Sequence, residues 1–335
     1  MPLEASTAAV RELTFGEAIK EAIAEEMRRD PSVVLMGEDV AEAGTTFKVL
    51  VGLVDEFGKD RIIDTPISEA GFTGVGVGAA MTGMRPIIDI MFGDFLGIIM
   101  DQVANQAAKI HYMSGGKWKV PMVIRATMGA TRRSGSQHSQ SLHAWTSHIP
   151  GLKVVVPSTA YDAKGLFKAA VRDDNPVVIF EHKISYRKVK GPVPADDYIV
   201  PLGVADVKRE GSDITFIATS SMVQTSLGAA KMLEEVGISA EVVDPRTMWP
   251  LDEKTLVESV RKTSRCIVMD EGYTRYGVSG ELASVVQEQA FYELDGPVRR
   301  LCAMHVPIPF SPSLEDMTVP SERQAFDLAR QMVNR

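Results

Sequence analysis

The chain has 335 residues, which is enough for about two α/β domains of ordinary size. Its 36 basic and 44 acidic residues give a net charge of −8, which argues against nucleic acid or an anionic membrane as the main partner. The two cysteines, Cys266 and Cys302, stand alone in apolar runs without histidine or cysteine at ligand spacing. They therefore do not predict a zinc site and are more typical of packing residues in a reducing compartment.

The first 30 residues contain several acids and no continuous apolar segment, unlike a secretory signal or a typical transit peptide. No stretch approaches the roughly 20 apolar residues that a membrane-spanning helix needs. We therefore expect a cytoplasmic protein with no membrane or nucleic-acid partner.

Strand-like and helix-like segments alternate along the first half of the chain. Thr14 and Glu17 have the spacing of a capping box, followed by apolar residues at helical intervals. Short apolar strands are expected at 32–36, 86–92, 120–126, 152–157 and 176–182, and helices at 68–84, 95–113 and 161–173. Because these strands are continuously apolar, the pattern predicts a parallel sheet covered by helices on both faces.

Residues 187–203, RKVKGPVPADDYIVPLG, are rich in proline and charge and lack periodicity, which predicts a linker between domains. The alternation of strands and helices then restarts, with apolar strands near 214–219, 240–244, 266–271 and 298–304. The sequence therefore predicts two successive doubly wound α/β domains, at residues 10–186 and 204–335.

A carboxylate follows one predicted strand closely. The strand ends at Ile63, Pro66 turns the chain, and Glu69 opens the next helix, at the edge of the sheet where open α/β folds bind ligands. An isolated acid at this position more often only complements the helix dipole. The following glycines have the spacing G-x-x-G-x-G-x-G within the helix, which is not a dinucleotide fingerprint and favours close helix packing.

Two further segments are candidates for function. Phe95 lies at a junction of strand and helix, where an aromatic residue is more often part of the core than a stacking platform. A Gly/Ser-rich loop of about twenty residues follows the strand at 120–126 and is longer than ordinary connections, which suggests a functional loop. It contains His138, His143 and His148, whose spacing matches no metal motif, and we expect at least two of them to be structural.

Together and in this order, several segments resemble the beta subunit of the two-chain, thiamine-diphosphate-dependent decarboxylating components of pyruvate, branched-chain 2-oxo-acid and acetoin dehydrogenases. The segments are ISEAGFTGVGVGAAMTGMRPI (67–87), QAAK (106–109), QHSQS (137–141), IPGLKVVVPS (149–158), DNPVVIFEHK (174–183) and VPIPFSPSLED (306–316). They extend over nearly the whole chain. The resemblance implies a pyrimidine-binding transketolase-like domain followed by a transketolase C-terminal-like domain.

The resemblance also implies roles for individual residues. Glu69 is expected to meet the aminopyrimidine ring nitrogen of thiamine diphosphate, favouring the tautomer that removes the thiazolium proton. Phe95 is expected to pack against the aminopyrimidine, with Ile67 as a neighbouring backbone contact. His138 is expected near the substrate and the incoming lipoyl group, and Glu38 in a polar tunnel between paired active sites.

A potassium loop is implied as well. Its hard oxygen ligands would be carbonyl groups near Met122, Ala170 and Val171, together with Asp173 and Asn175.

One motif of such enzymes is missing from the sequence. Their cofactor diphosphate is held through Mg²⁺ by a GDG motif followed by asparagine, whereas this chain has only Gly93-Asp94-Phe95. We therefore expect an alpha subunit to supply the Mg²⁺ and diphosphate ligands, with the active site between the chains. The usual assembly of such enzymes has two alpha and two beta chains, and a lipoyl acyltransferase core receives the acyl group.

The substrate is left open among pyruvate, a branched-chain 2-oxo acid and acetoin. Arg132 and Arg133 stand where pyruvate-type chains usually have small residues, and residues 304–316 resemble acetoin-type chains at least as much. Three alternatives remain. They are the C-terminal half of a split transketolase, a nucleotide-binding α/β oxidoreductase, whose G-x-G-x-x-G turn is missing, and a non-catalytic assembly subunit.

Overall fold

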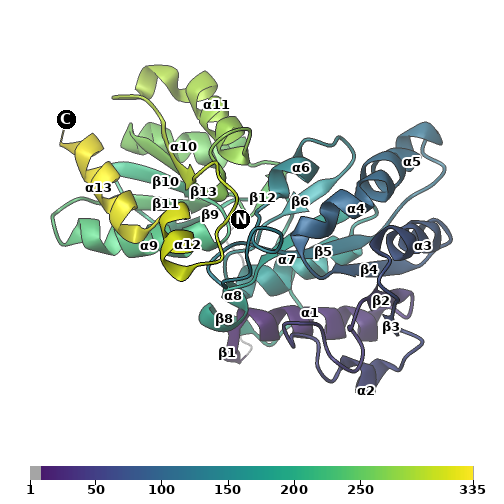
Figure 1. Cartoon of the computed structure of the whole chain (residues 1–335). Helices are drawn as coiled ribbons and strands as arrows, with labels where there is room; N and C mark the ends of the chain where they lie inside the picture. The colour runs from purple at the N-terminus through teal and green to yellow at the C-terminus, as the bar shows by residue number, and fades with distance from the viewer. Residues whose placement is uncertain (1–8, 335) are drawn as a thin grey trace.

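The computed structural model describes residues 9–334, which form two α/β units (Figure 1). The strands of the first unit's main sheet are β2 (Val33–Gly37), β3 (Ile62–Asp64), β4 (Arg85–Ile90), β5 (Val123–Met128), β6 (Lys153–Val155), β7 (Val177–His182) and β12 (Thr247–Trp249). Their order is β12-β6-β7-β5-β4-β2-β3, and all neighbouring pairs are parallel except β12 with β6.

The second unit is built on a five-stranded sheet. Its strands are β9 (Asp206–Arg209), β10 (Ile214–Ala218), β11 (Ala240–Asp244), β13 (Cys266–Tyr273) and β14 (Arg299–Ala303). Their order is β14-β13-β10-β11-β9, with only β9 antiparallel to its neighbour. Its helices are α9 (Ser221–Glu234), α10 (Glu253–Thr263), α11 (Val278–Ala290), α12 (Pro312–Thr318) and α13 (Glu322–Val333), with a 3₁₀ turn, η3 (Phe291–Glu293), after α11.

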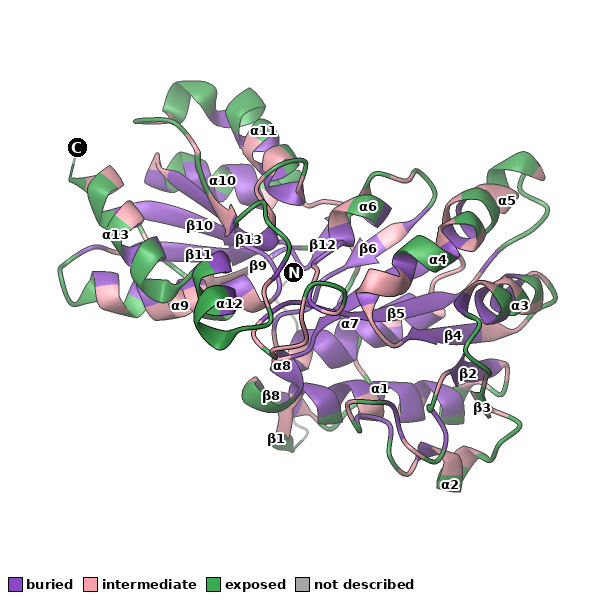
Figure 2. Ribbon diagram, in the orientation of Figure 1, coloured by how far each residue is buried: buried purple, intermediate pink, exposed green. Residues whose placement is uncertain are grey.

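Helices cover both faces of each sheet, which confirms the predicted doubly wound arrangement. In β2, Val33 and Leu35 pack into the core that contains α1 (Phe15–Arg29) and α7 (Ala160–Arg172). The alternate residues Val34 and Met36 pack into the opposite core, beneath α3 (Glu69–Met81). Because successive side chains of a strand point to opposite faces, a continuously apolar strand is the signature of such a two-sided core. Figure 2 shows the resulting buried sheets between partly exposed helices.

Local signals explain the beginning of α1. The hydroxyl of Thr14 accepts a hydrogen bond from the backbone N–H of Glu17 (3.2 Å), and the Glu17 carboxylate accepts one from the backbone N–H of Thr14 (2.8 Å). This is the predicted capping box, which satisfies two N–H groups that a helix start otherwise leaves without partners.

The helix predicted at 95–113 is divided in the structure. It consists of a 3₁₀ turn, η1 (Gly93–Phe95), followed by α4 (Leu96–Met100), the π-helical segment η2 (Asp101–Ala107) and α5 (Ala108–Met113). Gln102 of η2 lies against α3, 3.6 Å from the position that a Cβ atom on Gly74 would occupy. Segments of π-helix are often found at functional sites, and this one lies beside the helix that begins with Glu69.

The segment 187–203, predicted to be an irregular linker, contains a strand and packs on the first unit. β8 (Lys190–Pro194) pairs antiparallel with β1 (Val10–Thr14). Val193 and Val200 are buried in the core beneath α1 and α7. Prolines are compatible with a strand in a two-stranded ribbon because its outer edge needs no N–H donors, and this is why composition alone did not reveal the strand.

Three short helices complete the first unit, α2 (Leu53–Phe57), α6 (His143–Ser147) and α8 (Ser185–Lys188). Within residues 9–334, no helix combines the length and apolarity that crossing a bilayer requires.

Buried charges join the two units. Asp162 of α7 is fully buried and lies 2.7 Å from the guanidinium of Arg246, which also lies 3.0 Å from Asp206 of β9. Lys208 forms ion pairs with the same two aspartates. Each buried charge therefore faces an opposite charge, which offsets the cost of burying it.

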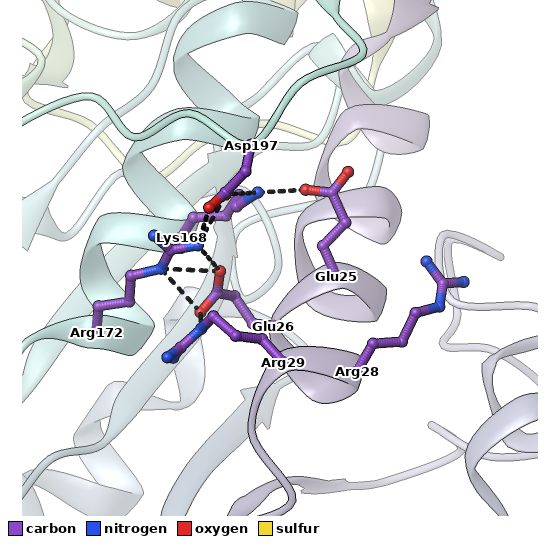
Figure 3. A pocket seen from close by; sticks show the side chains of 7 residues that line it. All are labelled: Glu25, Glu26, Arg28, Arg29, Lys168, Arg172 and Asp197. Carbon is purple, nitrogen blue, oxygen red and sulfur yellow. Dashed lines mark hydrogen bonds and ion pairs between the residues drawn. The ribbon is translucent and has the colours of Figure 1, made fainter.

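A second charged cluster lies between α1 and α7, around a hollow of about 310 Å³ (Figure 3). We call it the charged hollow, and its lining residues are Glu25, Glu26, Arg28, Arg29, Lys168, Arg172 and Asp197. Glu26 is fully buried and lies 2.6 Å from Arg172, while Lys168 contacts both Glu25 and Asp197. All seven side chains have an oppositely charged partner, so the hollow is a network of structural ion pairs.

Candidate active site

The carboxyl ends of the parallel strands β2, β3, β4, β5 and β7 meet at one edge of the first sheet, which we call the carboxyl edge. Glu38 directly follows β2, and Glu69 follows β3 after a short loop. Phe95 follows β4, and His138 lies in the long loop after β5. The fold therefore brings these four predicted residues to the same edge.

Glu69 is the first residue of α3, and its side chain is buried, with only 7% exposed. Ser68 precedes it as the N-cap residue but makes no capping hydrogen bond through its side chain. Ile67, two residues before Glu69, is 84% exposed. The loop before α3 thus turns an apolar side chain outward and a carboxylate inward, which is unusual unless another molecule covers this surface.

Glu38 lies near Glu69, and the two carboxylates interact unfavourably. Burial raises the pKa of Glu38, and the negative charges of Glu69, Asp39 and Asp89 raise it further. One carboxylate oxygen of Glu38 is buried without a hydrogen-bond partner. The Glu38 carboxyl group therefore keeps its proton to a higher pH than an isolated glutamate would.

Three rings form a compact group that we call the aromatic triad, Phe92, Phe95 and His138. The ring centroids of Phe92 and His138 are 4.6 Å apart, and those of Phe95 and His138 are 5.5 Å apart, both in edge-to-face arrangement. Lys183, at the end of β7, donates a hydrogen bond to the carbonyl oxygen of His138. Its ammonium lies 5.3 Å from the Phe92 centroid, and burial lowers its pKa to about 8.

Several polar atoms at the carboxyl edge have no hydrogen-bond partner although they are buried. They follow four neighbouring strands and are Oε1 of Glu38, Oγ1 of Thr65, Oδ2 of Asp94 and Oγ of Ser139. More than nine in ten buried polar groups in proteins are paired, so a cluster of unpaired ones indicates a place where a polar ligand, water or another chain binds. The donor and acceptor groups of an aminopyrimidine ring fit such a lining.

A buried ion network lies in the sheet below this edge. Arg125 of β5 makes two hydrogen bonds to the carboxylate of Glu181 (2.8 and 2.6 Å) and one to Asp89. The hydroxyl of Tyr186 donates to Glu181 as well (2.6 Å). These residues were not predicted from the sequence, although three charges in the middle of apolar strands are a recognisable signal. The network fixes β4, β5 and β7 relative to one another beneath the site.

The second unit also contributes to the edge. Glu271, on β13, lies 2.7 Å from the imidazole of His182 and accepts a hydrogen bond from the backbone N–H of Ala130 (2.6 Å). Although burial alone would raise it, the pKa of Glu271 is lowered to about 2 by His182 and by these hydrogen bonds. This residue was not predicted either, and its signal was the acidic pair that ends the apolar run CIVMDE.

The three histidines of the long loop have different environments. His143 is buried and lies 3.1 Å from Asp270 of the second unit, while His148 is exposed at the end of α6. Of the three, His138 is the one whose ring contacts Phe92 and Phe95. The loop thus places one histidine at the carboxyl edge and one in the contact between the units.

The predicted potassium ligands lie at the opposite, amino edge of the sheet. The guanidinium of Arg85 donates to the carbonyl oxygens of Val171 (3.0 Å) and Asp173 (2.9 Å). The Asp173 carboxylate accepts hydrogen bonds from Asn175 and lies 2.5 Å from the ammonium of Lys153. In the described part of the chain, no three His, Cys, Asp or Glu side chains are grouped to hold a metal. The potassium loop, with its carbonyl ligands, stays a prediction.

Two α/β units in series, with a buried glutamate at the start of a helix and an aromatic group at the same sheet edge, define the transketolase-like class. Comparison with known families agrees. Residues 11–189 match the transketolase pyrimidine-binding domain, and residues 203–324 match the transketolase C-terminal domain.

Characterised relatives are more specific. Over 323 residues, 93% of this chain and 94% of the relative, the chain is 50% identical to acetoin:2,6-dichlorophenolindophenol oxidoreductase subunit beta of Bacillus subtilis. It is 46% identical to 2-oxoisovalerate dehydrogenase subunit beta of the same organism over 304 residues, 90% of this chain and 93% of that one. It is also 46% identical to pyruvate dehydrogenase E1 component subunit beta of Rhizobium meliloti, over 95% of this chain and 69% of that one.

Solved structures share the fold. A split-gene transketolase, described as an inactive beta4 tetramer, has a TM-score of 0.77 and 25% identity, with coverage of 96% of this chain and 98% of that one. Transketolase from Leishmania mexicana has a TM-score of 0.72 at 16% identity, covering all of this chain and 47% of that one.

The chain belongs to the family of beta subunits of the pyruvate, 2-oxoisovalerate and acetoin dehydrogenase components. The members of this family are thiamine-diphosphate-dependent oxidoreductases, and a subunit named beta implies an alpha partner.

Proposed function

We propose that this chain supplies the aminopyrimidine-binding half of an active site that decarboxylates a pyruvate-like 2-oxo acid, or cleaves acetoin, and reductively acylates a lipoyl group. The observation that carries the proposal is the buried Glu69 carboxylate beside a second carboxylate, Glu38, one oxygen of which is buried without a hydrogen-bond partner. Burying an acid without a cationic partner is costly. A pair of such acids therefore indicates a site where the carboxylates take part in chemistry.

Thiamine diphosphate bound between the chains would supply a carbon nucleophile for the substrate carbonyl. Glu69 would hold a proton at the ring nitrogen of the aminopyrimidine, and its negative charge favours the tautomer in which the exocyclic nitrogen acts as a base. Phe95 would pack against the ring, and the backbone at the exposed Ile67 would contact its edge.

His138 would act on the substrate side of the site. Its ring is held between Phe92 and Phe95, and Lys183 fixes its backbone. An imidazole in this position can donate or accept a proton as the acyl group is transferred to the lipoyl sulfur.

An alpha subunit would complete the site with the ligands for Mg²⁺ and diphosphate. Helix α3 supports this assignment because Gly71, Val75 and Gly78 form an exposed stripe at helical spacing directly beyond Glu69. A Cβ atom on Gly78 would meet nothing within 4 Å. Small residues let a helix of another chain approach closely, and close packing offsets the low helix propensity of glycine. The assembly would contain two alpha and two beta chains, with Glu38 in the tunnel between the paired sites.

We also propose domain boundaries, a bound ion, a cellular location and a second protein partner. We place the domains at 10–186 and 204–335, with 187–203 as a connector that is packed on the first domain. A potassium ion would stabilise the loop at Asp173 through carbonyl oxygens. We propose a cytoplasmic location and a lipoyl acyltransferase core as the partner that receives the acyl group.

Binding of the cofactor tests the proposal directly. Calorimetric titration with thiamine diphosphate and Mg²⁺ should show weak binding to the purified chain and tight binding after the alpha subunit is added. Micromolar binding to the chain alone would contradict the shared site. Turnover of pyruvate, a branched-chain 2-oxo acid and acetoin by the assembled enzyme would then identify the substrate, whereas ketol transfer without a lipoyl acceptor would indicate a split transketolase.

A further inference from the structure

The loop that carries His138 begins with an unusual backbone. Four alternate residues have φ in the left-handed region, Gly129 (+98°), Thr131 (+70°), Arg133 (+59°) and Gly135 (+77°). This conformation is unfavourable for a β-branched residue such as Thr131, and it persists only where surrounding contacts hold it. We call residues 129–135 the anchored segment.

A single carboxylate of the second unit holds the centre of the anchored segment. Glu315, on α12, is fully buried and accepts hydrogen bonds from the backbone N–H groups of Thr131 (2.8 Å) and Arg133 (3.2 Å). It also accepts one from the guanidinium of Arg133 (2.5 Å). Backbone N–H groups that a turn gathers into one concavity bind an anion, and here the Glu315 carboxylate is that anion.

Further contacts lead from this anchor to His138. The hydroxyl of Ser136 donates to the carbonyl oxygen of Ile308 (2.8 Å), and the backbone N–H of His138 lies 3.3 Å from the carbonyl oxygen of Gly135. These contacts tie the residues immediately before His138 to the second unit. Arg133, one of the two arginines that distinguish this loop from pyruvate-type chains, pairs with Glu315 and Asp316 of the second unit.

We propose that Glu315 is a positioning residue for His138, through which the C-terminal unit sets the geometry of the substrate side of the active site. The inference rests on the proposed role of His138. The carboxylate is suited to this task because it only accepts hydrogen bonds, whereas an amide in its place would turn an NH₂ donor toward N–H donors.

The variant Glu315→Gln tests this in the enzyme assembled with its alpha subunit. Asp316→Asn is the matched control, because Asp316 pairs with the same guanidinium (2.7 Å) but is 57% exposed and binds no backbone N–H. Acylation of a free lipoyl domain should slow about 10- to 100-fold in Glu315→Gln, since small misplacements of catalytic groups have effects of this size. It should change by no more than about twofold in Asp316→Asn. Affinity for thiamine diphosphate should be unchanged in both variants.

A His138→Asn background separates positioning from general loss of structure. If Glu315 acts through His138, adding Glu315→Gln to His138→Asn should not slow lipoyl acylation further. A full additional loss in the double variant, or wild-type activity of Glu315→Gln beside an impaired His138→Asn, would overturn the inference. Full activity of His138→Asn would instead refute the proposed role of His138.

A second variant covers the case in which Glu315→Gln does not assemble. Arg133→Met removes the guanidinium but leaves both backbone contacts to Glu315. It should slow lipoyl acylation a few-fold when His138 is present and have no effect when His138 is replaced. An unchanged rate in the presence of His138 would also count against the inference.

Discussion

The charged hollow and the carboxyl edge both contain buried acidic groups of the first unit, but they differ in whether those groups have oppositely charged partners. In the charged hollow, Glu26 meets two arginines, and Lys168 meets two acids. At the carboxyl edge, Glu38 faces Glu69 and has an unpaired oxygen. A hollow lined with charges is therefore not by itself a functional site. The informative feature is the group that the protein leaves without a partner.

This comparison predicts that replacing an edge acid impairs chemistry while replacing a paired acid impairs stability. The largest effect is expected for Glu69→Gln in the assembled enzyme, which keeps the shape of the side chain but removes its charge. Exchange of the cofactor's thiazolium proton in deuterium oxide, followed by NMR, should slow about 10²- to 10⁴-fold. Assembly and cofactor affinity should be nearly normal.

Glu17→Gln is the matched control, because Glu17 is also an acid in the first turn of a helix. It should cost about 1 kcal/mol of stability and leave proton exchange intact. If Glu69→Gln behaved in the same way, Glu69 would only cap α3, and the carboxyl edge would resemble the charged hollow.

Glu271 combines features of the two regions, because it lies at the carboxyl edge but both of its carboxylate oxygens have hydrogen-bond partners. Its pKa of about 2 lies below the ordinary value of 4.5, so between these values the unfolded chain binds more protons than the folded one. Stability that Glu271 contributes above pH 4.5 is therefore lost as the pH falls toward 2. The total is up to about 3 kcal/mol at 1.4 kcal/mol per pKa unit.

Urea unfolding between pH 3 and pH 6 measures this contribution. The slope of stability against pH should be shallower in Glu271→Gln than in the wild type, and unchanged in a variant of the exposed Glu288. Equal slopes in Glu271→Gln and the wild type would show that the His182–Glu271 pair does not stabilise the folded state.

A smaller effect on stability is expected in the charged hollow. Lys168→Met removes a buried ammonium, but Glu25 keeps Lys164 as a partner and Asp197 keeps Arg172. We expect a loss of about 2 kcal/mol in urea unfolding, with the turnover number of the assembled enzyme unchanged at low temperature. A lowered turnover number with normal stability would mean that the hollow serves the reaction after all.

The smallest effect is expected at the amino edge. Exchanging potassium for tetramethylammonium at constant ionic strength should lower stability by about 1 kcal/mol, because an ion that binds only the folded state stabilises it. Asn175→Ala should reduce this dependence. A melting temperature that does not respond to potassium would leave the side chains of Arg85, Lys119 and Lys153 as the cations that hold this loop in the described part of the chain.

The sequence predicted the layered fold because its signals are local. The apolar run of β2 and the capping box at Thr14 determine their elements without reference to the rest of the chain. Glu69 and His138 could be singled out because each lies near a strand end within a recognisable motif. The roles of Glu271 and Glu315 were not apparent from the sequence, because they depend on which backbone N–H groups the folded chain brings to them from more than 140 residues away.

Strand β12 illustrates the same limit. Its three residues carry no periodic signal, and it pairs with β6, about 90 residues earlier in the chain. Only the folded structure reveals this pairing, because the contact depends on how the second unit packs against the first.

The position of β12 has a consequence for how the protein is made. Until residues 247–249 have left the ribosome, β6 is an uncovered edge strand of the sheet. Its free N–H and C=O groups can then pair with a strand of another chain. The N-terminal half is thus incomplete while it is being synthesised. A fragment that ends at the connector would therefore expose β6 and be prone to aggregate, so the first unit needs a strand from the second to complete its sheet.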